Sequence, residues 1–596
     1  MPFRQTIRSF YMKLTGSQII IKMLEKEGIT TVAGIPGGSI LPLYDELNRS
    51  SIRHVLVRQE QAAGFIAQGM TRTTGKPAVC MATSGPGAMN LLTAIADARA
   101  DSIPIIAITG QVNTYLIGTD AFQEADTFGL SFPITKHSIA VKTPEELLTA
   151  IPQAFAIAME GRPGPVLIDV PRDVQLATCE VKSLPDPEDF IVKEEDIRFH
   201  TSKEKMQELI SATVKMLSAA EKPVLYLGGG CNSQEAAKVL REFKKNYRLP
   251  VVSSLMGLGA IPKSDRDFAG MVGMHGSYAA NAAMYESDLV IAAGVRFDDR
   301  ATGVVKKFCP EAKIIHIDID AAEINKILPA SVSMVAKVES VFPLITKALL
   351  KEKGAGKFEG ERNFWADKII KTSEETFSVN TGTPAAKDKA KGFEDSTNPR
   401  SFMASIVNLA EKAGLKEKDL LVTTDVGQHQ MFAAQYYPVN EPGTFLTSGS
   451  LGTMGFGLPA ALGAALANPD KRVICFSGDG SIMMNIQELA TLAENNLPVT
   501  VIVYVNGTLG MVYQQQKYLF DKNYSASTFS AKPDLLKIAA GFGIEGTDAN
   551  SDPDWYKKAF DRNRANKPYF VTVCVDPEES VLPFVPGGKA NVDSIR

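Results

Sequence analysis

The chain has 596 residues, which is too long for one hydrophobic core and predicts three or four domains at ~150 residues each. Hydrophobic residues make up 45% and charged residues 22%, and the net charge of −4 gives no electrostatic reason to expect a nucleic acid or an anionic membrane as partner. No apolar run reaches the ~18 residues that a membrane span needs. The six cysteines have no metal-binding spacing, so we expect buried free thiols in a cytoplasmic protein.

The N-terminal stretch is short, basic and free of acidic residues. It runs from Met1 to Lys13 and lacks the apolar core of a targeting segment, and Met12 offers an alternative start. We therefore expect residues 1–13 to form a disordered tail.

Residues 14 to about 180 alternate between strand-like and helix-like patterns. The sequence predicts strands at 30–35, 54–57, 77–82 and 103–109, separated by turns and helical patterns. This alternation is typical of a doubly wound parallel sheet. Because the carboxyl ends of parallel strands meet at one edge, the turns Pro36-Gly37-Gly38 and Ser84-Gly85-Pro86-Gly87 predict a cleft there.

Glu60 begins a helical pattern directly after the second of these strands. A carboxylate in the first turn of a helix is favoured by the helix dipole by ~0.3–1 kcal/mol, which is an ordinary structural interpretation. Its place at the same sheet edge as the glycine turns allows a second interpretation, a functional carboxylate in the cleft. Glu60 alone does not decide between them.

The middle of the chain carries a second α/β pattern between two polar connections. Residues 186–204 are charged and punctuated by proline, which indicates a linker. The new pattern opens at Pro223 to Leu227 with a turn at Gly228, and it ends near residue 345. Residues 351–397 are rich in Lys, Glu and Ala apart from the surroundings of Trp365, so we expect an exposed connection that carries a helix.

A third α/β pattern runs from about residue 398 to 575, and its clearest unit spans Val473 to Asn506. A strand, a helical pattern and a second strand follow one another there, which is almost always a right-handed parallel crossover. Asp479 and Asn506 then stand just past the ends of strands that we expect to be neighbours. Gly-Asp-Gly and Asn-Gly are also common turns, but a carboxylate and an amide oxygen suit Mg²⁺ and predict a Mg²⁺-bridged diphosphate site.

Two further segments of this third pattern offer groups that bind anions. Gln428 and His429 follow a strand and Gly427, although His429 is as readily a buried structural histidine. A glycine-rich run with Gly452 and Met454 precedes a helical pattern whose first amides can bind an anion. Methionine at such a position more often packs than takes part in chemistry.

These motifs together resemble one family. The Gly478-Asp479-Gly480 turn, Asn506 27 residues after Asp479, and the distant Glu60 are similar to the thiamine-diphosphate enzymes. Longer segments resemble the acetolactate synthase (acetohydroxyacid synthase) large catalytic subunits, namely 36–42, 120–124, 161–166, 296–300, 428–431 and 452–455.

The resemblance implies a fold of three doubly wound, parallel-sheet α/β domains. These would be a pyrimidine-binding domain at 14–185, a central FAD-associated domain at 203–345, and a thiamine diphosphate and Mg²⁺-binding domain at 398–575, followed by a C-terminal tail at 576–596.

The resemblance also implies a role for each candidate residue. Glu60 would bond to N1′ of the cofactor's aminopyrimidine and promote the tautomer that removes the reactive proton of the thiazolium. The catalytic set would be completed by Gln123, Phe122, Gly38 and Met454. The ligands of Mg²⁺ would be Asp479, Asn506 and the carbonyl of Thr508. The thiamine diphosphate would be bound by Gly427, Gln428, His429, Gly452, Met454, Gly478, Asp479, Gly480, Ser481, Asn506, Thr508 and Met511, and the FAD by Arg162, Gly228, Arg296, Asp298, Asp299, Arg300 and Asp318.

The implied activity is that of an acetolactate synthase. Pyruvate is decarboxylated and joined to a second 2-oxo acid, pyruvate or 2-oxobutyrate, in the biosynthesis of branched-chain amino acids, and the FAD does no net redox chemistry. Three alternatives are open. Glyoxylate carboligase resembles a version of the site in which a nonpolar residue replaces Glu60, pyruvate oxidase uses a redox-active flavin, and a non-catalytic scaffold would retain only the fold.

Gln515 departs from the family pattern, because many members carry a tryptophan there that is associated with preference for 2-oxobutyrate. Replacing a flat apolar face with an amide removes at most ~1–3 kcal/mol of discrimination, so we expect a weak acceptor preference. The resemblance further implies a homodimer or tetramer, with each site built from two copies, and a separate small regulatory subunit.

Overall fold

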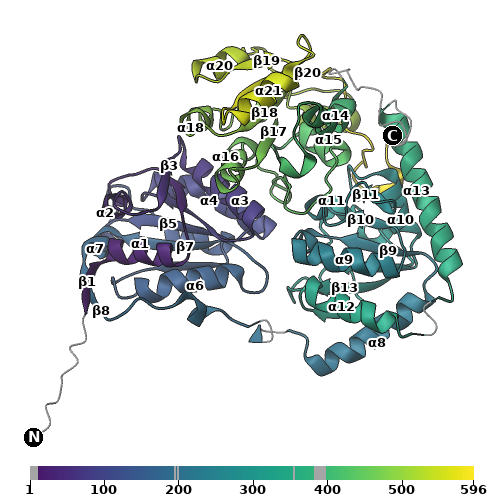
Figure 1. The fold of residues 1–596 in the computed structure, drawn as a ribbon, viewed down its shortest axis with the longest axis horizontal. Helices are drawn as coiled ribbons and strands as arrows, with labels where there is room; N and C mark the ends of the chain where they lie inside the picture. The colour runs from purple at the N-terminus through teal and green to yellow at the C-terminus, as the bar shows by residue number, and fades with distance from the viewer. Residues whose placement is uncertain (1–10, 194–195, 198–199, 353–355, 382–397) are drawn as a thin grey trace, which may run out of the picture. The chain divides into compact units, whose positions relative to one another are not determined.

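The computed structural model describes residues 11–193, 196–197, 200–352, 356–381 and 398–596. Three six-stranded sheets organise these residues, and all neighbouring strands within each sheet are parallel (Figure 1). The predicted class of three doubly wound α/β domains is therefore confirmed. The contacts within the chain form two compact units, one around the N-terminal sheet and one around the central and C-terminal sheets, and the predicted domain boundaries stay predictions.

The N-terminal sheet has the strand order β3-β2-β4-β5-β7-β6. Its strands are β2 (Thr31–Gly34), β3 (Arg53–Leu56), β4 (Ala78–Ala82), β5 (Ile105–Gln111), β6 (His137–Ala140) and β7 (Val166–Pro171). Its helices are α1 (Gly16–Lys26), α2 (Leu41–Leu47), α3 (Glu60–Thr74), α4 (Pro86–Asp101), α5 (Thr127–Ser131), α6 (Leu147–Met159) and α7 (Arg172–Leu176). Strands β4, β5 and β7 are buried along their whole length, which is why they read as continuous apolar runs.

A short antiparallel ribbon joins the two ends of this region. It consists of β1 (Met12–Thr15) and β8 (Thr178–Val181), with Met12 opposite Val181 and Lys13 opposite Glu180. The prediction of a disordered tail is therefore wrong for Met12 and Lys13, because a partner strand far along the chain orders them. Residues 1–10 lie outside the described residues.

The central sheet has the order β11-β10-β9-β12-β13-β14. Its strands are β9 (Pro223–Leu227), β10 (Val251–Ser253), β11 (Phe268–Met271), β12 (Leu289–Ala293), β13 (Lys313–Asp318) and β14 (Val332–Val335). Its helices are α8 (Lys203–Ala219), α9 (Gln234–Asn246), α10 (Tyr278–Glu286), α11 (Asp299–Thr302) and α12 (Val338–Leu349).

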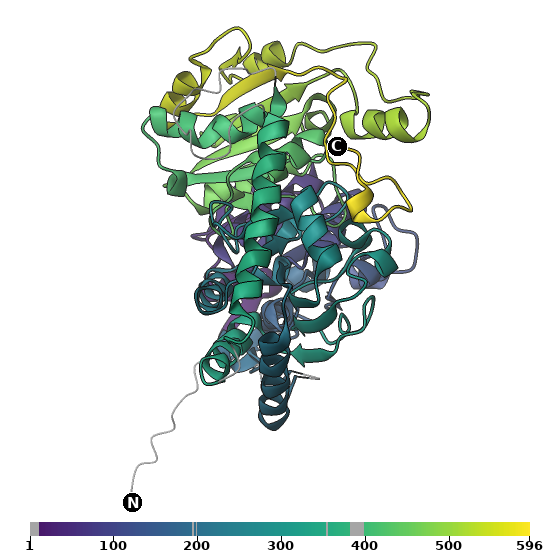
Figure 2. The same ribbon diagram turned by 90° about the vertical axis from the view of Figure 1, so that its right-hand side faces the viewer.

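The connection predicted at residues 351–397 carries the long helix α13 (Glu359–Thr381), which lies beside α10 (Figures 1 and 2). Trp365 explains this docking, because its side chain is buried and its Nε1 donates a hydrogen bond to the Pro223 carbonyl at 3.2 Å. Phe364 remains exposed, as expected for a surface connection. Residues 353–355 and 382–397 of the predicted connection lie outside the described residues.

The C-terminal sheet has the order β16-β15-β17-β18-β20-β19. Its strands are β15 (Leu420–Thr424), β16 (Phe445–Leu446), β17 (Arg472–Gly478), β18 (Val499–Val505), β19 (Gly546–Asp548) and β20 (Tyr569–Cys574). Its helices are α14 (Pro399–Lys412), α15 (Gln428–Tyr436), α16 (Gly457–Ala467), α17 (Asp479–Ile482), α18 (Glu488–Glu494), α19 (Gly510–Leu519), α20 (Leu535–Gly541) and α21 (Trp555–Arg564).

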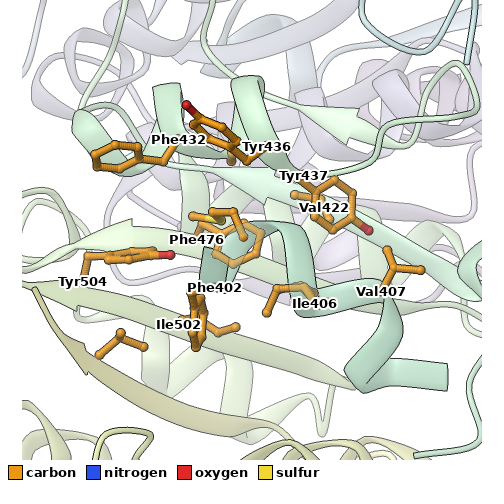
Figure 3. Close-up of a cluster of buried hydrophobic side chains, with 14 of the residues drawn as sticks. Phe402, Ile406, Val407, Val422, Phe432, Tyr436, Tyr437, Phe476, Ile502 and Tyr504 are labelled. Atoms are coloured by element: carbon orange, nitrogen blue, oxygen red, sulfur yellow. The ribbon is translucent and has the colours of Figure 1, made fainter. Parts of the chain in front are cut away.

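An aromatic core fixes α14 against this sheet (Figure 3). Phe402 of α14 meets Tyr504 of β18 edge-on at 5.9 Å between ring centroids and stacks on Trp555 of α21 at 5.5 Å. Phe476 of β17 and Ile502 of β18 complete the contact, and both are fully buried. Such pairs add ~0.5–1.5 kcal/mol beyond their buried area, so they hold the ends of β17 and β18 in place.

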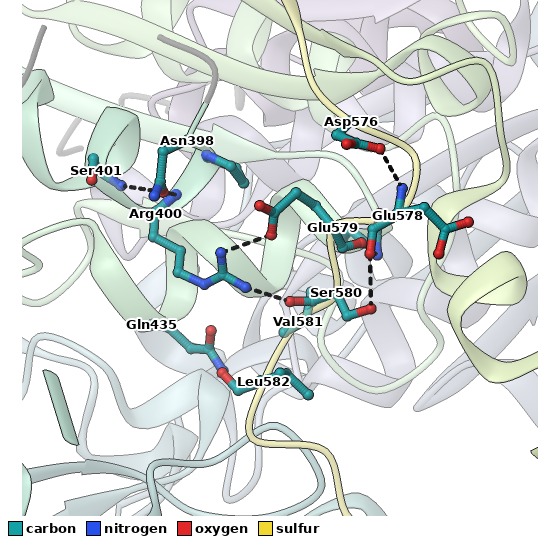
Figure 4. Close-up of polar contacts among 12 residues, drawn as sticks. Asn398, Arg400, Ser401, Gln435, Asp576, Glu578, Glu579, Ser580, Val581 and Leu582 are labelled. Carbon is teal, nitrogen blue, oxygen red and sulfur yellow. Dashed lines mark hydrogen bonds and ion pairs between the residues drawn. The ribbon is translucent and has the colours of Figure 1, made fainter. Parts of the chain in front are cut away.

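The C-terminal tail docks on the same compact unit through polar contacts with its backbone (Figure 4). Arg400 of α14 forms an ion pair with Glu579 at 2.8 Å and donates a hydrogen bond to the Ser580 carbonyl at 2.7 Å. Gln435 of α15 donates to the Leu582 carbonyl at 3.2 Å. Further along, Phe584 stacks on both His275 and Tyr518. The tail is therefore an integral part of this unit.

Five of the six cysteines are buried free thiols, as predicted, whereas Cys574 is exposed at the end of β20. Among the described helices, none combines the length and apolar character that crossing a membrane requires.

Substitution of Gly228 by alanine is expected to loosen the central sheet. A Cβ at this position would lie 1.9 Å from the Gly294 carbonyl oxygen and 2.8 Å from the Val295 Cα, so β9 and β12 would have to separate. We expect Gly228→Ala to lower the free energy of unfolding by ~1–3 kcal/mol, measured by thermal or urea unfolding.

Gly229→Ala is the matched control, because its Cβ would meet only the side chain of Met256, at 3.3 Å. An equal loss of stability in both variants would show that the close approach of β9 and β12 is not what demands glycine.

Candidate functional site

Each of the three sheets has a point where the strand order reverses. In the N-terminal sheet the reversal lies between β2 and β4, in the central sheet between β9 and β12, and in the C-terminal sheet between β15 and β17. Ligands in open α/β sheets bind beyond the carboxyl ends of the strands at this point. The candidate residues fall at all three of these edges.

At the N-terminal edge, the predicted residues follow neighbouring strands. Gly38 lies in the turn after β2, Glu60 is the first residue of α3 after β3, and Gln123 lies in the loop after β5. A Cβ on Gly85, in the turn after β4, would lie 2.7 Å from the Gln123 carbonyl oxygen, so these two turns are in close contact. Phe122 is 88% exposed, which makes it available to another molecule.

Glu60 has a hydrogen-bond partner that the sequence did not reveal. The Asn90 Nδ2 donates a hydrogen bond to Glu60 Oε2 at 2.9 Å. The other oxygen, Glu60 Oε1, lies 3.4 Å from the position that a Cβ on Gly87 would take, so the glycine leaves room beside it. Asn90 therefore orients one carboxylate oxygen and leaves the other for a ligand. One feature of the sequence pointed to this role: Asn90 lies in the first part of α4, just after the Gly85-Pro86-Gly87 loop at the same sheet edge.

At the C-terminal edge, Asp479 and Asn506 are close neighbours, as predicted. Strands β17 and β18 pair in parallel up to Gly478 and Tyr504. Asp479 Oδ2 then accepts hydrogen bonds from the backbone N–H groups of Asn506 at 3.2 Å and Gly507 at 2.6 Å. Burial raises the pKa of Asp479 above its usual value, and the backbone amides oppose that shift. A cation at this position would favour the ionised carboxylate further.

The remaining predicted diphosphate residues surround this pair. Asn506 Oδ1 accepts from both the N–H of Thr508 at 3.0 Å and its hydroxyl at 2.9 Å. Asn506 Nδ2 donates to Gln428 Oε1 at 3.3 Å, which joins β18 to the start of α15. Ser481 is buried, and its hydroxyl accepts from the Gly478 N–H at 3.0 Å. Met511 lies in the first turn of α19, half-buried, four residues before Gln515 on the same helix.

His429 presents a buried nitrogen with no protein partner. It is the second residue of α15, and burial lowers its pKa to about 3, so the imidazole is neutral. Its Nε2 has no hydrogen-bond partner in the part of the chain that the structure describes. A buried polar atom without a partner costs free energy, so this nitrogen is ready to bond with a ligand.

Helix α15 is anchored at both ends. At its start, Gln428 Nε2 donates to Gln514 Oε1 at 3.0 Å and to the Glu579 carbonyl at 2.9 Å. At its end, the half-buried Lys263 of the central region donates to the carbonyls of Ala434 at 2.5 Å and Tyr437 at 2.8 Å. Burial lowers the pKa of Lys263 to about 7, and the dipole at a helix C-terminus opposes that shift. Gln428 therefore positions the helix as well as facing the site.

Asp425 is a second residue that the sequence reasoning missed. It follows β15 and is fully buried, and burial raises its pKa to about 6. Its Oδ1 accepts from the N–H groups of Val426 and Gly455, both at 2.8 Å, and its Oδ2 from the Ser477 hydroxyl at 3.3 Å. The signal was a carboxylate directly after an apolar strand, the same pattern as Asp479.

Asp425 thereby holds the loop that carries Met454. Gly455 is bonded to Asp425, and the Thr453 N–H donates to the Ser448 hydroxyl at 2.9 Å, so Met454 is fixed from both sides. Gly452, with φ of 70°, supplies the left-handed turn before it. Met454 itself is half-buried.

At the central edge, the predicted residues follow β9, β12 and β13. Gly228 follows β9, Arg296 follows β12 and donates to the Ser450 hydroxyl, and Asp318 ends β13, where it is buried. Asp298 caps α11, with its Oδ1 3.1 Å from the N–H groups of Arg300 and Ala301, while the side chains of Asp299 and Arg300 are exposed. Arg162 lies in the other compact unit, and its Nε donates to the Ser102 hydroxyl at 2.8 Å.

Sequence profiles of known families match along the chain. The N-terminal TPP binding domain of the thiamine pyrophosphate enzymes matches residues 14–130, their central domain matches 210–345, and their C-terminal TPP binding domain matches 425–573. The acetolactate synthase isozyme 1 large subunit of Escherichia coli K12 is 47% identical over 584 residues, with 98% of each chain covered. The chain belongs to the family of acetolactate synthase large subunits.

Other members of this family are also similar over nearly the full length. The isozyme 2 large subunit of Escherichia coli K12 is 41% identical over 98% of this chain and 100% of its own. The probable acetolactate synthase large subunit of Methanocaldococcus jannaschii is 41% identical over 96% of this chain and 94% of its own. The resemblance to acetolactate synthases, rather than to the alternatives, is therefore confirmed.

Asp425 is expected to make the stability of the chain depend on pH. Its pKa is about 6 in the folded chain and ordinarily 3.8, so between these values the folded state binds the proton more tightly than the unfolded state. The free energy of unfolding contributed by Asp425 therefore falls as pH rises from about 4 to about 6, by at most about 3 kcal/mol. Urea unfolding of the wild type and of Asp425→Asn at pH 4.5 and pH 7 measures this difference.

Asp425→Asn lacks the titrating group, so its stability relative to the wild type should improve with rising pH. Parallel pH profiles for the two proteins would contradict this electrostatic assignment. Asp425→Ala is expected to lose stability at every pH, because it leaves the Gly455 and Val426 amides without their acceptor.

Proposed function

We propose that the chain is the catalytic subunit of an acetolactate synthase, which decarboxylates pyruvate and joins the resulting two-carbon unit to pyruvate or 2-oxobutyrate. The observation that carries this proposal is the pairing of Asp479 and Asn506 beyond β17 and β18 in a chain that also keeps Glu60 at the start of α3. Full-length similarity to proteins named acetolactate synthase large subunits supports the reaction.

Thiamine diphosphate and Mg²⁺ are the cofactors that fit the C-terminal edge. Asp479 and Asn506 offer a carboxylate and an amide oxygen next to each other, and the Thr508 carbonyl would complete the protein ligands of Mg²⁺, whose other ligands would be phosphate oxygens and water. A diphosphate oxygen only accepts hydrogen bonds, so it would favour a proton on the unpaired Nε2 of His429, which would then donate to it. Gly427, Gly478 and Gly480 would let the diphosphate approach the backbone closely.

When bound, thiamine diphosphate supplies a nucleophilic carbon and takes up the electron pair that is released as CO₂ leaves the 2-oxo acid. Glu60 would hold the proton exchanged at N1′ of the aminopyrimidine, with Asn90 fixing the direction of its carboxylate. Met454 would support the bent form of the cofactor, since its loop is fixed on both sides. Gly38, Phe122 and Gln123 would bind the 2-oxo acids and exclude water.

The central edge fits a flavin dinucleotide. The strand order reverses between β9 and β12, where a Cβ on Gly228 would lie 1.9 Å from the Gly294 carbonyl oxygen and a Cβ on Gly294 would lie 2.6 Å from the Gly230 Cα. Backbone without side chains at such a reversal is typical of dinucleotide sites. Arg296 and Asp318 at the same edge would contact the FAD, together with Asp298, Asp299 and Arg300, and the flavin would have a structural role.

We also propose a cytoplasmic homodimer or tetramer with a separate small regulatory subunit. The relatives are named large subunits, which implies a small one. Phe122, Phe132 and Tyr115 are 88%, 68% and 72% exposed in the N-terminal unit, as expected for a surface that a second copy covers. Five buried free thiols are typical of a reducing compartment.

A competition assay tests the reaction. Pyruvate and 2-oxobutyrate are supplied together with thiamine diphosphate, Mg²⁺ and FAD, and both acetohydroxy acids are quantified without oxygen. We expect acetolactate and acetohydroxybutyrate from the wild type, and at least about a hundredfold lower rate from Glu60→Gln, because an amide cannot transfer a proton to and from N1′ as a carboxyl group does.

Three other outcomes of such assays would contradict the proposed reaction. Product formation that requires oxygen would indicate pyruvate oxidase, and tartronate semialdehyde from glyoxylate would indicate glyoxylate carboligase. Equal inactivity of the wild type and Glu60→Gln would indicate a non-catalytic scaffold.

Substitution of Gln515 by tryptophan is expected to shift acceptor choice towards 2-oxobutyrate. Gln515 is half-buried on α19, and an indole would add an apolar face for the extra methyl group. We expect the ratio of acetohydroxybutyrate to acetolactate to rise about tenfold, within the ~1–3 kcal/mol that one methylene provides. Val512→Trp is the control, because Val512 is exposed on the same helix, and an equal shift there would contradict the role of Gln515.

A further inference from the structure

The loop that carries Phe122 and Gln123 is held at both ends by carboxylates from one short segment. It runs from residue 112, after β5, to residue 126, before α5. The two carboxylates are Asp169, within β7, and Asp173, in α7. Neither aspartate is among the residues assigned to the site above.

At the end of the loop, Asp169 acts through Gln111. Gln111 Nε2 donates to Asp169 Oδ2 at 3.0 Å and to the Ala125 carbonyl at 2.8 Å, and its Oε1 accepts from the Val112 N–H at 2.8 Å. Asp169 Oδ1 accepts from the Thr109 hydroxyl at 2.7 Å. Both side chains are almost fully buried, with Asp169 5% and Gln111 4% exposed.

This network leaves Gln111 only one orientation. The Val112 N–H can face only the oxygen of the Gln111 amide, so the NH₂ group lies towards Asp169 and Ala125. The second N–H of that group is then directed at Ala125, two residues after Gln123. Burial raises the pKa of Asp169 to about 7, and its bonds to Thr109 and Gln111 oppose that shift.

At the start of the loop, Asp173 bonds to Thr114. Its Oδ1 accepts from the Thr114 N–H at 3.0 Å and its Oδ2 from the Thr114 hydroxyl at 2.5 Å. Between the two anchors, Glu124 accepts from the N–H groups of Gly118 and of Ala121, the latter at 2.9 Å. The loop is thus closed on itself and fixed at both ends.

Gln123 sits in this loop with a strained backbone. Its φ of 60° lies in the left-handed region, which a non-glycine residue keeps only when its surroundings impose it. On one side, Gly85 packs against Gln123 so closely that a Cβ added to Gly85 would lie 3.0 Å from the Gln123 Cα. On the other side, the Gln111 amide bonds to the Ala125 carbonyl.

We propose that Gln111 and Asp169 are positioning residues for the carboligation site, which hold Gln123 and Phe122 where the 2-oxo acid binds. The inference rests on the proposed function, in which Gln123 contacts substrate. Asp169 fixes the Gln111 amide, the amide fixes the Ala125 carbonyl, and the carbonyl fixes the left-handed turn at Gln123.

Gln111→Glu is the decisive variant, because it changes one NH₂ group into an oxygen and keeps the shape. The Val112 bond survives, but Ala125 loses its donor and Asp169 faces a second carboxyl group. We expect faster hydrogen exchange in residues 113–126 of the cofactor-free chain. We also expect kcat/KM for pyruvate to fall about tenfold to a hundredfold, as a misplaced binding group implies, with little change in the concentration of thiamine diphosphate that half-saturates the enzyme.

The double variant Gln111→Glu with Asp169→Asn separates positioning from stability. The amide that Asp169→Asn introduces can donate through its NH₂ group to the new carboxylate, and its oxygen can accept from Thr109, so the buried pair is restored. The Ala125 carbonyl still faces an oxygen. We therefore expect the thermal midpoint to recover towards the wild-type value, while the fast exchange of the loop and the loss in kcat/KM persist.

Gln153→Glu is the matched control, since Gln153 is exposed on α6 of the same unit and the charge change is identical. Recovery of both stability and kinetics in the double variant would overturn the proposal, as would a Gln111→Glu protein that matches Gln153→Glu in exchange and in kcat/KM. If the wild type makes no carboligated product, the proposed function fails, and the exchange measurement still tests whether Gln111 fixes the loop.

Discussion

The reversal of strand order is the constraint on which the three edges depend. In each sheet the chain builds one or two strands outward, returns beside its first strand and continues on the other side. The helices that follow the two strands at the reversal leave in opposite directions, so no helix covers the carboxyl ends between them. Polar groups therefore collect there, and the chain must satisfy them without filling the space that a ligand needs.

Buried carboxylates solve this problem in a repeated way. Asp479 ties the end of β17 to the start of the loop after β18, Asp425 ties the end of β15 to the glycine-rich loop, and Asp169 ties the ends of β5 and β7 to the loop after β5. Each accepts backbone or amide N–H groups and none has a cationic partner in these contacts. Hydrogen bonds to a carboxylate are stronger than those to a neutral acceptor, which offsets part of the desolvation that raises their pKa values.

The amino-acid sequence predicts the parts of this arrangement that are local. Apolar runs followed by glycine-containing turns marked β2, β17 and β18. The strand-helix-strand pattern between Asp479 and Asn506 placed these two residues at one edge correctly. Asn90 and Gln111 were missed because the partners that define their roles are distant in sequence, as with Asn90 and Glu60, thirty residues apart. Asp425 has the local pattern of Asp479, but its bond to Gly455, which gives it a role, also spans thirty residues. The same reason explains why residues 12 and 13 were predicted to be disordered: β8, the partner strand that orders β1, lies more than 150 residues further along the chain.

The docking of the tail has a consequence for how the protein is made. The buried amide of Gln428 needs the carbonyl of Glu579, and Gln514 needs both the N–H and the carbonyl of Val581. These partners come after every strand of the C-terminal sheet in the chain. During translation the start of α15 lacks part of its hydrogen bonding until residues 579–581 have been made, so the C-terminal sheet reaches its final packing only after all of its strands have been synthesised.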